Sequence, residues 1–256
     1  MSEVKHHGAR RIWIAWETQR RSITLSRKVG AELHILDLAR YGIWRYPLSM
    51  MRTARLLFAN RGGIVFVQNP SMILAALAAF CKPMLRYTLI VDRHTNFTQI
   101  EETRSTPVRR LLLWMSRFSI RRADLTIVTN SDIDERYVRG TGRGFVLPDP
   151  YPELTEVPKS AISTHNDLRV LFVSSWQTDE PIREVIEVCR RLGSKITVYI
   201  SGRVKPAYAS VIASRPENFI PTGFLTDDEY FRLMSTVDCV LAVSSWPGTL
   251  CCGAYE

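Results

Sequence analysis

Short apolar segments and helix-like segments alternate along the whole chain, and this alternation is the feature that most constrains the fold. The apolar segments show little alternation with polar residues, as expected of strands that are covered by helices on both faces. Strands that alternate with helices at this spacing predict βαβ units and parallel sheets. In the first part of the chain we expect strands at 12–15, 33–36, 64–67, 88–91, 125–128 and 145–147, and helices at 22–29, 48–59, 72–80, 108–122 and 132–139.

A proline-rich stretch, residues 148–158, then interrupts the pattern. Its prolines cannot lie inside a sheet or a helix, so we expect a linker there. The alternation restarts with strands at 170–173, 196–200, 219–220 and 239–243 and helices at 180–192, 207–214 and 227–235. We therefore predict an α/β protein of two Rossmann-like doubly wound domains, with boundaries at 1–150, 151–167 for the linker and 168–256.

The last residues read as a strand, a glycine loop and the first turn of a further helix. An α/β layer that ends in this way predicts that the second domain is incomplete and that the chain is a fragment.

Positive charge is concentrated in the first half of the chain. Residues 1–155 contain 24 Lys and Arg against 13 Asp and Glu, a net charge of +11, whereas residues 156–256 have a net charge of −2. Such a surface attracts phosphates, anionic lipids or nucleic acid.

The longest apolar run, residues 72–81, is too short to span a bilayer, which takes about 20 residues. Five cysteines without metal spacing favour reduced thiols in the cytoplasm.

The carboxyl ends of the predicted strands are the expected binding sites, because ligands of doubly wound sheets lie there. Asp92 and His94 follow the fourth strand and share a face, so they are candidates for a general base. Glu17, after the first strand, is a second candidate. No glycine-rich dinucleotide loop follows the first strand and the chain has no P-loop, which argues against a dinucleotide cofactor and against a P-loop nucleotidase.

The glycine loop near the end of the chain is the better candidate for phosphate binding. Gly248 and Gly253 permit close approach of the backbone, and a following helix N-terminus would supply unpaired amide groups. Glu256 could accept hydrogen bonds from ribose hydroxyls. Arg203 and Lys205, after the second strand of the second domain, could neutralise a diphosphate.

Four segments, at 121–130, 146–150, 223–241 and 248–256, together resemble glycosyltransferases of the B fold, which have two Rossmann-like domains. Three further segments, at 68–70, 91–94 and 173–176, are similar to the β-mannosyltransferase type that extends lipid-linked chitobiose. The likeness covers nearly the whole chain and lies in the order of the segments rather than in one motif.

This resemblance implies transfer of a sugar from a nucleotide-diphosphate sugar to a lipid-linked acceptor or a polysaccharide precursor, without a metal or a further cofactor. It implies that the basic first domain binds the acceptor, that Asp92 or His94 supplies the base of an inverting reaction, and that Glu256 binds the ribose. It also implies a cytoplasmic enzyme, peripheral on the inner face of an anionic membrane, with no nucleic-acid partner. The implied donor-binding residues are Arg203, Lys205, Gly248, Thr249, Gly253 and Glu256.

The sequence departs from the family pattern at two places. Retaining members usually carry a second Glu eight residues before the ribose Glu, and here that residue is Gly248. The Arg/Lys pair that often follows the first strand of the donor domain is replaced by residues 176–180. Binding of the diphosphate is then left to Arg203, Lys205 and the glycine loop. With an incomplete second domain, we expect the chain as given to have little or no transferase activity.

Two alternatives remain open from the sequence. One is a non-catalytic protein that binds a membrane or nucleic-acid surface, since the helix at 108–122 interleaves arginines with Trp114, Phe118 and a run of leucines. The arginines are Arg109, Arg110, Arg117, Arg121 and Arg122. The other is a nucleotide-sugar epimerase of the same fold. Binding of a nucleotide would separate the transferase from the non-catalytic protein.

Overall fold

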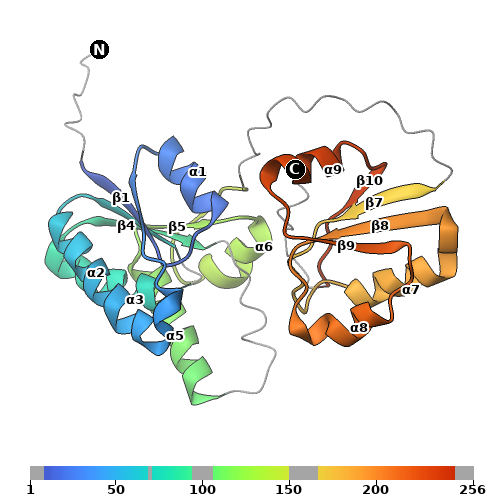
Figure 1. The fold of residues 1–256 in the computed structure, drawn as a ribbon. Coiled ribbons are helices and arrows are strands. Elements are labelled where there is room, and N and C mark those ends of the chain that lie inside the picture. Colours follow the sequence, from blue (N-terminus) through green and yellow to red (C-terminus); the bar gives the residue numbers. More distant parts are fainter. Residues whose placement is uncertain (1–8, 69–70, 94–105, 150–166, 246–256) are drawn as a thin grey trace, which may run out of the picture. The chain divides into compact units, whose positions relative to one another are not determined.

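The computed structural model describes residues 9–68, 71–93, 106–149 and 167–245, and the chain divides into two compact units, 1–150 and 151–256 (Figure 1). Each unit is built on one sheet whose strands are all parallel, of six strands in the first unit and four in the second. The prediction of two Rossmann-like α/β units with parallel sheets is therefore confirmed.

The sheet of the first unit has the strand order β2-β1-β3-β4-β5-β6. Each strand lies within two residues of its predicted position, because short runs of Ile, Val, Leu and Phe suit strands that helices cover. The strands are β1 (Arg11–Ala15), β2 (Glu32–Ile35), β3 (Ile64–Gln68), β4 (Thr88–Arg93), β5 (Leu125–Val128) and β6 (Gly144–Val146).

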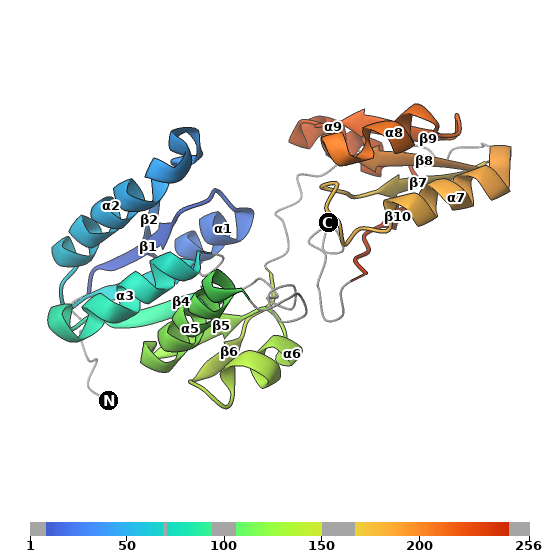
Figure 2. The ribbon, with the colours of Figure 1, turned by 90° about the horizontal axis from the view of Figure 1, so that it is seen from below.

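Three helices of the first unit, α2, α3 and α5, lie side by side over one face of the sheet, with α3 packed against both of its neighbours (Figure 2). Ser71 caps α3 and Thr106 caps α5 through side-chain hydrogen bonds to backbone amides, as these residue types commonly do. The helical segments are α1 (Arg20–Lys28), η1 (Ala39–Trp44), α2 (Arg45–Ala59), α3 (Met72–Leu85), α5 (Pro107–Arg122), α6 (Ser131–Ile133) and the π-helical turn η2 (Asp134–Val138).

Alternate residues of β1 point to opposite faces of the sheet and build two cores. Ile12 and Ile14 belong to a cluster with residues of α2 and α3, whereas Trp13 belongs to a separate cluster with Leu25 of α1. Trp13 stacks on Phe66, with ring centroids 5.1 Å apart. The first unit is therefore packed on both faces of its sheet.

The second unit repeats the design with the strand order β10-β7-β8-β9. Its core gathers Phe172, Ile182, Ile186, Val198 and other side chains between β7, β8 and α7. Thr226 and Glu229 form a capping box at the start of α9. The elements are β7 (Leu168–Phe172), α7 (Ile182–Leu192), η3 (Gly193–Lys195), β8 (Ile196–Ser201), η4 (Pro206–Tyr208), α8 (Ala209–Ala213), β9 (Phe219–Gly223), α9 (Asp227–Met234) and β10 (Cys239–Leu241).

Two helical segments differ most from their predicted extents, although α2 also begins three residues earlier and α7 two residues later than expected. The helix expected to end at residue 80 continues through Pro83 to Leu85, whose buried side chain packs in the core, and it ends at Arg86 with a left-handed φ of 55°. The helix expected at 132–139 is instead the short α6 followed by a π-helical turn. No helix in the described part of the chain is long and apolar enough to cross a bilayer.

The cysteines of the described residues should differ sharply in reactivity. Burial raises the pKa of the Cys189 thiol to about 11 and also raises the pKa of the Cys81 thiol, whereas Cys239 is exposed. Since the thiolate is the reactive form, iodoacetamide near neutral pH should alkylate Cys239 in the native protein and the two buried thiols only after unfolding. Peptide mapping by mass spectrometry measures this. Equal labelling of Cys189 and Cys239 in the native state would contradict the packing.

Candidate functional site

The carboxyl ends of the parallel strands, where ligands of such sheets bind, carry polar side chains in both units. In the first unit Glu17 follows β1, Gln68 ends β3, Asp92 lies near the end of β4, and Asp149 follows β6. Glu17 is exposed, whereas Gln68 and Asp92 are buried. Gln68 pairs with Asp92 in the register of β3 and β4, and its Nε2 has no hydrogen-bond partner among the described residues.

A buried arginine joins three of the elements that meet at this edge. Arg21, in the first turn of α1, donates from Nε to both carboxylate oxygens of Asp92, at 3.0 and 3.2 Å. Its Nη1 donates to Asp149 Oδ1 at 2.7 Å, and its Nη2 donates to the carbonyl of Leu147 at 3.0 Å. The side chain of Arg21 is 5% exposed and that of Asp92 is fully buried. Arg21 thereby ties α1 to the ends of β4 and β6.

Opposite charges maintain this arginine in its charged form. Burial lowers the pKa of the Arg21 guanidinium, but the charge of Asp92 and the hydrogen bonds to Asp92 and Asp149 more than offset burial and raise the pKa overall. Loss of one partner from a buried ion pair typically costs about 3–5 kcal/mol, because the remaining charge is left in a medium of low polarity. The edge of the first sheet thus depends on a network of charges.

The structure places the three candidate bases differently. Asp92 lies buried at the predicted edge, and both of its carboxylate oxygens accept hydrogen bonds from Arg21. Glu17 is exposed at the same edge, with β3 between its strand and β4, a separation of about 10 Å across two strand spacings. His94 lies outside the described residues. The role of each as a base stays a prediction.

In the second unit the loop between β7 and α7, residues 173–181, occupies the carboxyl edge of the sheet. Glu180 anchors this loop, because its carboxylate accepts hydrogen bonds from the hydroxyl groups of Ser174 and Ser175 and from the Ser175 amide. The two hydrogen bonds from Ser175 are both 2.9 Å long. The next helix was expected to begin at Glu180, but with this side chain engaged in the loop α7 starts only at Ile182.

The same loop contains a buried tryptophan in an unusual backbone conformation. Trp176 has a φ of 59°, which is rare for a bulky side chain, and its ring is fully buried. Its indole Nε1 donates to the carbonyls of Ser201 and Gly202 at 2.9 and 3.0 Å. A Cβ at Gly202 would lie 2.3 Å from the carbonyl oxygen of Ser174, so only glycine fits there. The ends of β7 and β8 are therefore tightly interlocked.

A second acidic residue connects this loop to the end of β10. Asp179 accepts a hydrogen bond from the Ser244 hydroxyl at Oδ2, at 2.6 Å, and its backbone carbonyl accepts one from the Ser245 amide, also at 2.6 Å. Asp179 therefore holds the chain in place at Ser244 and Ser245, after β10.

The expected phosphate-binding residues are only partly within the described chain. Arg203 is exposed and Lys205 half-buried just after β8, and neither side chain makes a hydrogen bond or ion pair with the described residues. Gly248, Thr249, Gly253 and Glu256 lie outside the described residues. Arg203 directly follows Gly202, whose backbone contacts Ser174 and Trp176 of the loop at 173–181, so this cation stands next to that loop in the chain.

Arg21, Asp179 and Glu180 were not anticipated as residues that build these edges. The partners of Arg21 lie 71 and 128 positions further along the chain, and no local pattern reveals such a pair. A local signal did exist for the loop, since two serines at a strand end precede two adjacent acids. Acids of this kind commonly accept hydrogen bonds from nearby serines and backbone amides.

Substitution of Asp92 by Asn should destabilise the first unit strongly. Arg21 would retain Asp149 as a partner, so we expect a loss of about 3 kcal/mol in the free energy of unfolding, at the lower end for a buried pair. Glu32→Gln is the matched control, since it breaks the exposed pair with Arg10 and should cost less than about 1 kcal/mol. Denaturant titration measures both, and equal small losses would contradict the structural role of Arg21 and Asp92.

Substitution of Asp179 by Ala should loosen the end of β10. The Ser244 hydroxyl would lose its acceptor, at a cost of about 1–3 kcal/mol, and the Ser245 amide should exchange its hydrogen faster. Asp179→Asn is the control, because the amide oxygen can still accept the hydrogen bond and the effect should be smaller. Hydrogen exchange read at Ser245 distinguishes the two variants, and unchanged exchange in the alanine variant would argue against the anchor.

The comparisons with known proteins agree with this architecture. The family model described as Glycosyltransferase Family 4 matches residues 13–144, just over half of the chain. HepE of Anabaena in complex with UDP and glucose is 13% identical, with a TM-score of 0.64 over 93% of this chain and 68% of that one. Sucrose-phosphate synthase of Thermosynechococcus elongatus is 13% identical, with a TM-score of 0.58 over 81% of this chain and 57% of that one.

At these identities the solved structures show the fold alone, and they show the two Rossmann-like domains of the B fold. No curated protein sequence matches the chain. The match of the family model begins in β1 and ends at the start of β6, so it spans the sheet of the first unit. The chain belongs to Glycosyltransferase Family 4 and is a glycosyltransferase of the B fold.

Proposed function

We propose that this protein transfers a sugar from a nucleotide-diphosphate sugar to an acceptor that is lipid-linked or a polysaccharide precursor. The observation that carries the proposal is the match to Glycosyltransferase Family 4, combined with two cations beside the rigid loop at the carboxyl edge of the second sheet. Structures of the similar HepE of Anabaena contain UDP and glucose, or UDP-glucose, which supports a donor of this class.

The second unit would bind the donor. Arg203 and Lys205 could form charge-assisted hydrogen bonds with the diphosphate, and their positive charge would replace the metal ion that many diphosphate sites need. The glycine loop with Gly248, Thr249 and Gly253 would cradle the phosphates, and Glu256 would accept hydrogen bonds from the ribose. Asp179 and Glu180 would act as positioning residues, because they hold the loop at 173–181 and the chain at Ser244, after β10.

Catalysis would rest on positioning of the two substrates and on stabilisation of the departing diphosphate. The reaction breaks the bond between the sugar and the diphosphate and forms a bond to an acceptor hydroxyl, whose proton passes to a base. Of the two candidate bases within the described residues, Glu17 is the exposed one, whereas the carboxylate of Asp92 is engaged by Arg21. This contrast favours Glu17 as the base and leaves Asp92 and His94 as the alternatives.

The basic first unit would bind the acceptor. A lipid-linked acceptor is supported by the similarity of residues 68–70, 91–94 and 173–176 to the β-mannosyltransferase type that extends lipid-linked chitobiose. An enzyme with such an acceptor would work peripherally on the inner face of a membrane. Nucleic acid is not part of the proposal.

Calorimetric titration with UDP, GDP, UDP-glucose and GDP-mannose tests the donor site. We expect one base to bind, and Arg203→Gln combined with Lys205→Gln to weaken binding by about tenfold or more, since a hydrogen bond to a charged group contributes about 1.5–3 kcal/mol. Glu256→Gln should weaken nucleotide binding as well.

The matched control is Arg191→Gln combined with Lys195→Gln. It removes the same charge from α7 and η3, and Lys195 directly precedes the amino end of β8. The proposal is wrong if no nucleotide diphosphate binds, or if the control weakens binding as much as the variant after β8.

A further inference from the structure

Three neighbouring helices of the first unit carry many positive charges and no negative one. Helices α2, α3 and α5 contain three, one and five Arg or Lys residues and no Asp or Glu. The single lysine, Lys82, pairs with Asp124 at 2.7 Å, and the other eight cations are all arginines. The arginines are Arg45, Arg52, Arg55, Arg109, Arg110, Arg117, Arg121 and Arg122.

The same helices expose large apolar side chains. Phe80 of α3 is 73% exposed and Trp114 of α5 is 59% exposed, although both belong to helices that pack closely on the sheet. Met50, Met51, Met84, Val108 and Leu111 are exposed as well. A surface that combines several apolar side chains with cations is typical of a site that binds another molecule.

An apolar groove of about 690 Å³ runs between these helices. Its lining comes from Met50 of α2, from Ile73, Leu77 and Phe80 of α3, and from Trp114 of α5, among others. Arg122 is its only charged lining residue and lies over the ring of Phe118, with the guanidinium carbon 5.9 Å from the ring centroid. The groove therefore offers hydrocarbon contact with a cation at its rim.

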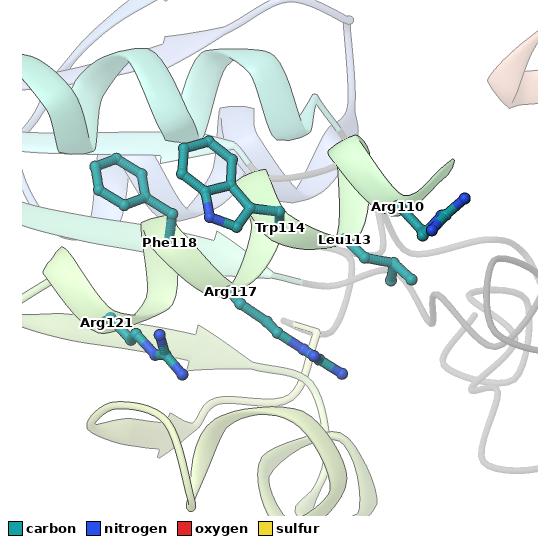
Figure 3. Close-up of a pocket in the computed structure, with 6 residues that line it drawn as sticks. All are labelled: Arg110, Leu113, Trp114, Arg117, Phe118 and Arg121. Atoms are coloured by element: carbon teal, nitrogen blue, oxygen red, sulfur yellow. The ribbon is translucent and has the colours of Figure 1, made fainter. Parts of the chain in front are cut away.

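Helix α5 carries aromatic and cationic side chains next to each other on one face, because residues three and four apart share a helix face. Figure 3 shows Trp114 and Phe118 leaning toward α3, whereas Arg117 and Arg121 extend away from it. The two rings stack with centroids 5.4 Å apart. A second hollow, of about 290 Å³, lies on α5 among Arg110, Leu113, Arg117 and Arg121 and shares the two aromatic rings with the groove.

We propose that this α2–α3–α5 face docks on an anionic lipid bilayer. The arginines would contact lipid phosphates, Trp114 and Phe80 would enter the interfacial region, and the groove would take the hydrocarbon chain of a lipid. This inference rests on the proposed function, because an enzyme with a lipid-linked acceptor has to reach a membrane. Binding of the face to a bilayer can nevertheless be tested without donor or acceptor.

A bilayer matches both properties of the face. Its anionic headgroups attract arginines, and its hydrocarbon layer begins directly below the headgroups, where amphipathic helices bury their apolar side chains. Nucleic acid would match the charge but would leave the apolar groove and the exposed Phe80 without a partner. The charge complementarity and the apolar groove, which lie on the same three helices, therefore favour a lipid surface.

Sedimentation of the full chain with vesicles tests the proposal. Binding is expected to vesicles of phosphatidylcholine mixed with phosphatidylglycerol, to fall with added salt, and to be at least tenfold weaker with phosphatidylcholine alone. Arg117→Gln combined with Arg121→Gln should weaken binding to the anionic vesicles by about tenfold or more. Phe80→Ala combined with Trp114→Ala should have a comparable effect, and because both side chains are largely exposed the fold should persist.

Matched controls and a depth measurement sharpen the result. Arg191→Gln combined with Lys195→Gln removes equal charge from the second unit and should leave vesicle binding unchanged. Quenching of tryptophan fluorescence by brominated lipids should occur in the native chain and should be largely lost in Trp114→Phe.

Absence of binding to anionic vesicles, or an equal loss in the control variant, would overturn the proposal. A dimer in analytical ultracentrifugation that dissociates on Trp114→Ala would also overturn it, in favour of a second copy of the chain as the occupant. Nucleotide binding in solution is read separately, so failure of the docking surface is distinguishable from failure of the donor site.

Discussion

The buried contact of Arg21 with Asp92 and Asp149 is the interaction on which the first unit depends most. A parallel sheet aligns the carboxyl ends of its strands, but it does not by itself join the outer strand β6 to β4 or to the helix after β1. Arg21 makes this connection through one side chain that reaches Asp92, Asp149 and the carbonyl of Leu147. The charged groups at this edge are thereby paired with one another, and the carboxylate of the candidate base Asp92 is engaged by Arg21.

The second unit obtains rigidity at the same edge by a different route. Instead of a charge triad it uses two acids that accept hydrogen bonds from serines and backbone amides, and an indole that donates to two carbonyls. The effect is a fixed loop from which exposed side chains project. The family match covers the sheet of the first unit only. The proposed donor site in the second unit therefore depends on its own structural feature, the anchored loop at 173–181.

Much of the fold could be predicted because its signals are local. The short apolar runs at β1, β3 and β5 predict buried strands from their composition alone. The prolines after β6 likewise predict the end of the first unit. The site could be predicted only in outline. Asp92 was expected at a strand end, yet its neighbour in space, Arg21, lies 71 residues away, and sequence spacing contains no trace of that contact. A helix was expected to begin at Glu180, but its carboxylate instead accepts short-range hydrogen bonds that compete with helix formation. Helix propensity alone does not reveal which of the two prevails.

The close approach at Gly202 also defines where the enzyme can be altered. A side chain at this position would collide with the carbonyl of Ser174, and the indole of Trp176 occupies the space beside it, so these three residues form a fixed frame. Gln177 and Thr178 lie in the same loop and are exposed, and no side-chain hydrogen bond ties either of them to the described residues. Libraries intended to change the donor of the proposed reaction would therefore diversify these two positions and leave the frame unchanged, because variation there adds new contacts without disturbing the ends of β7 and β8.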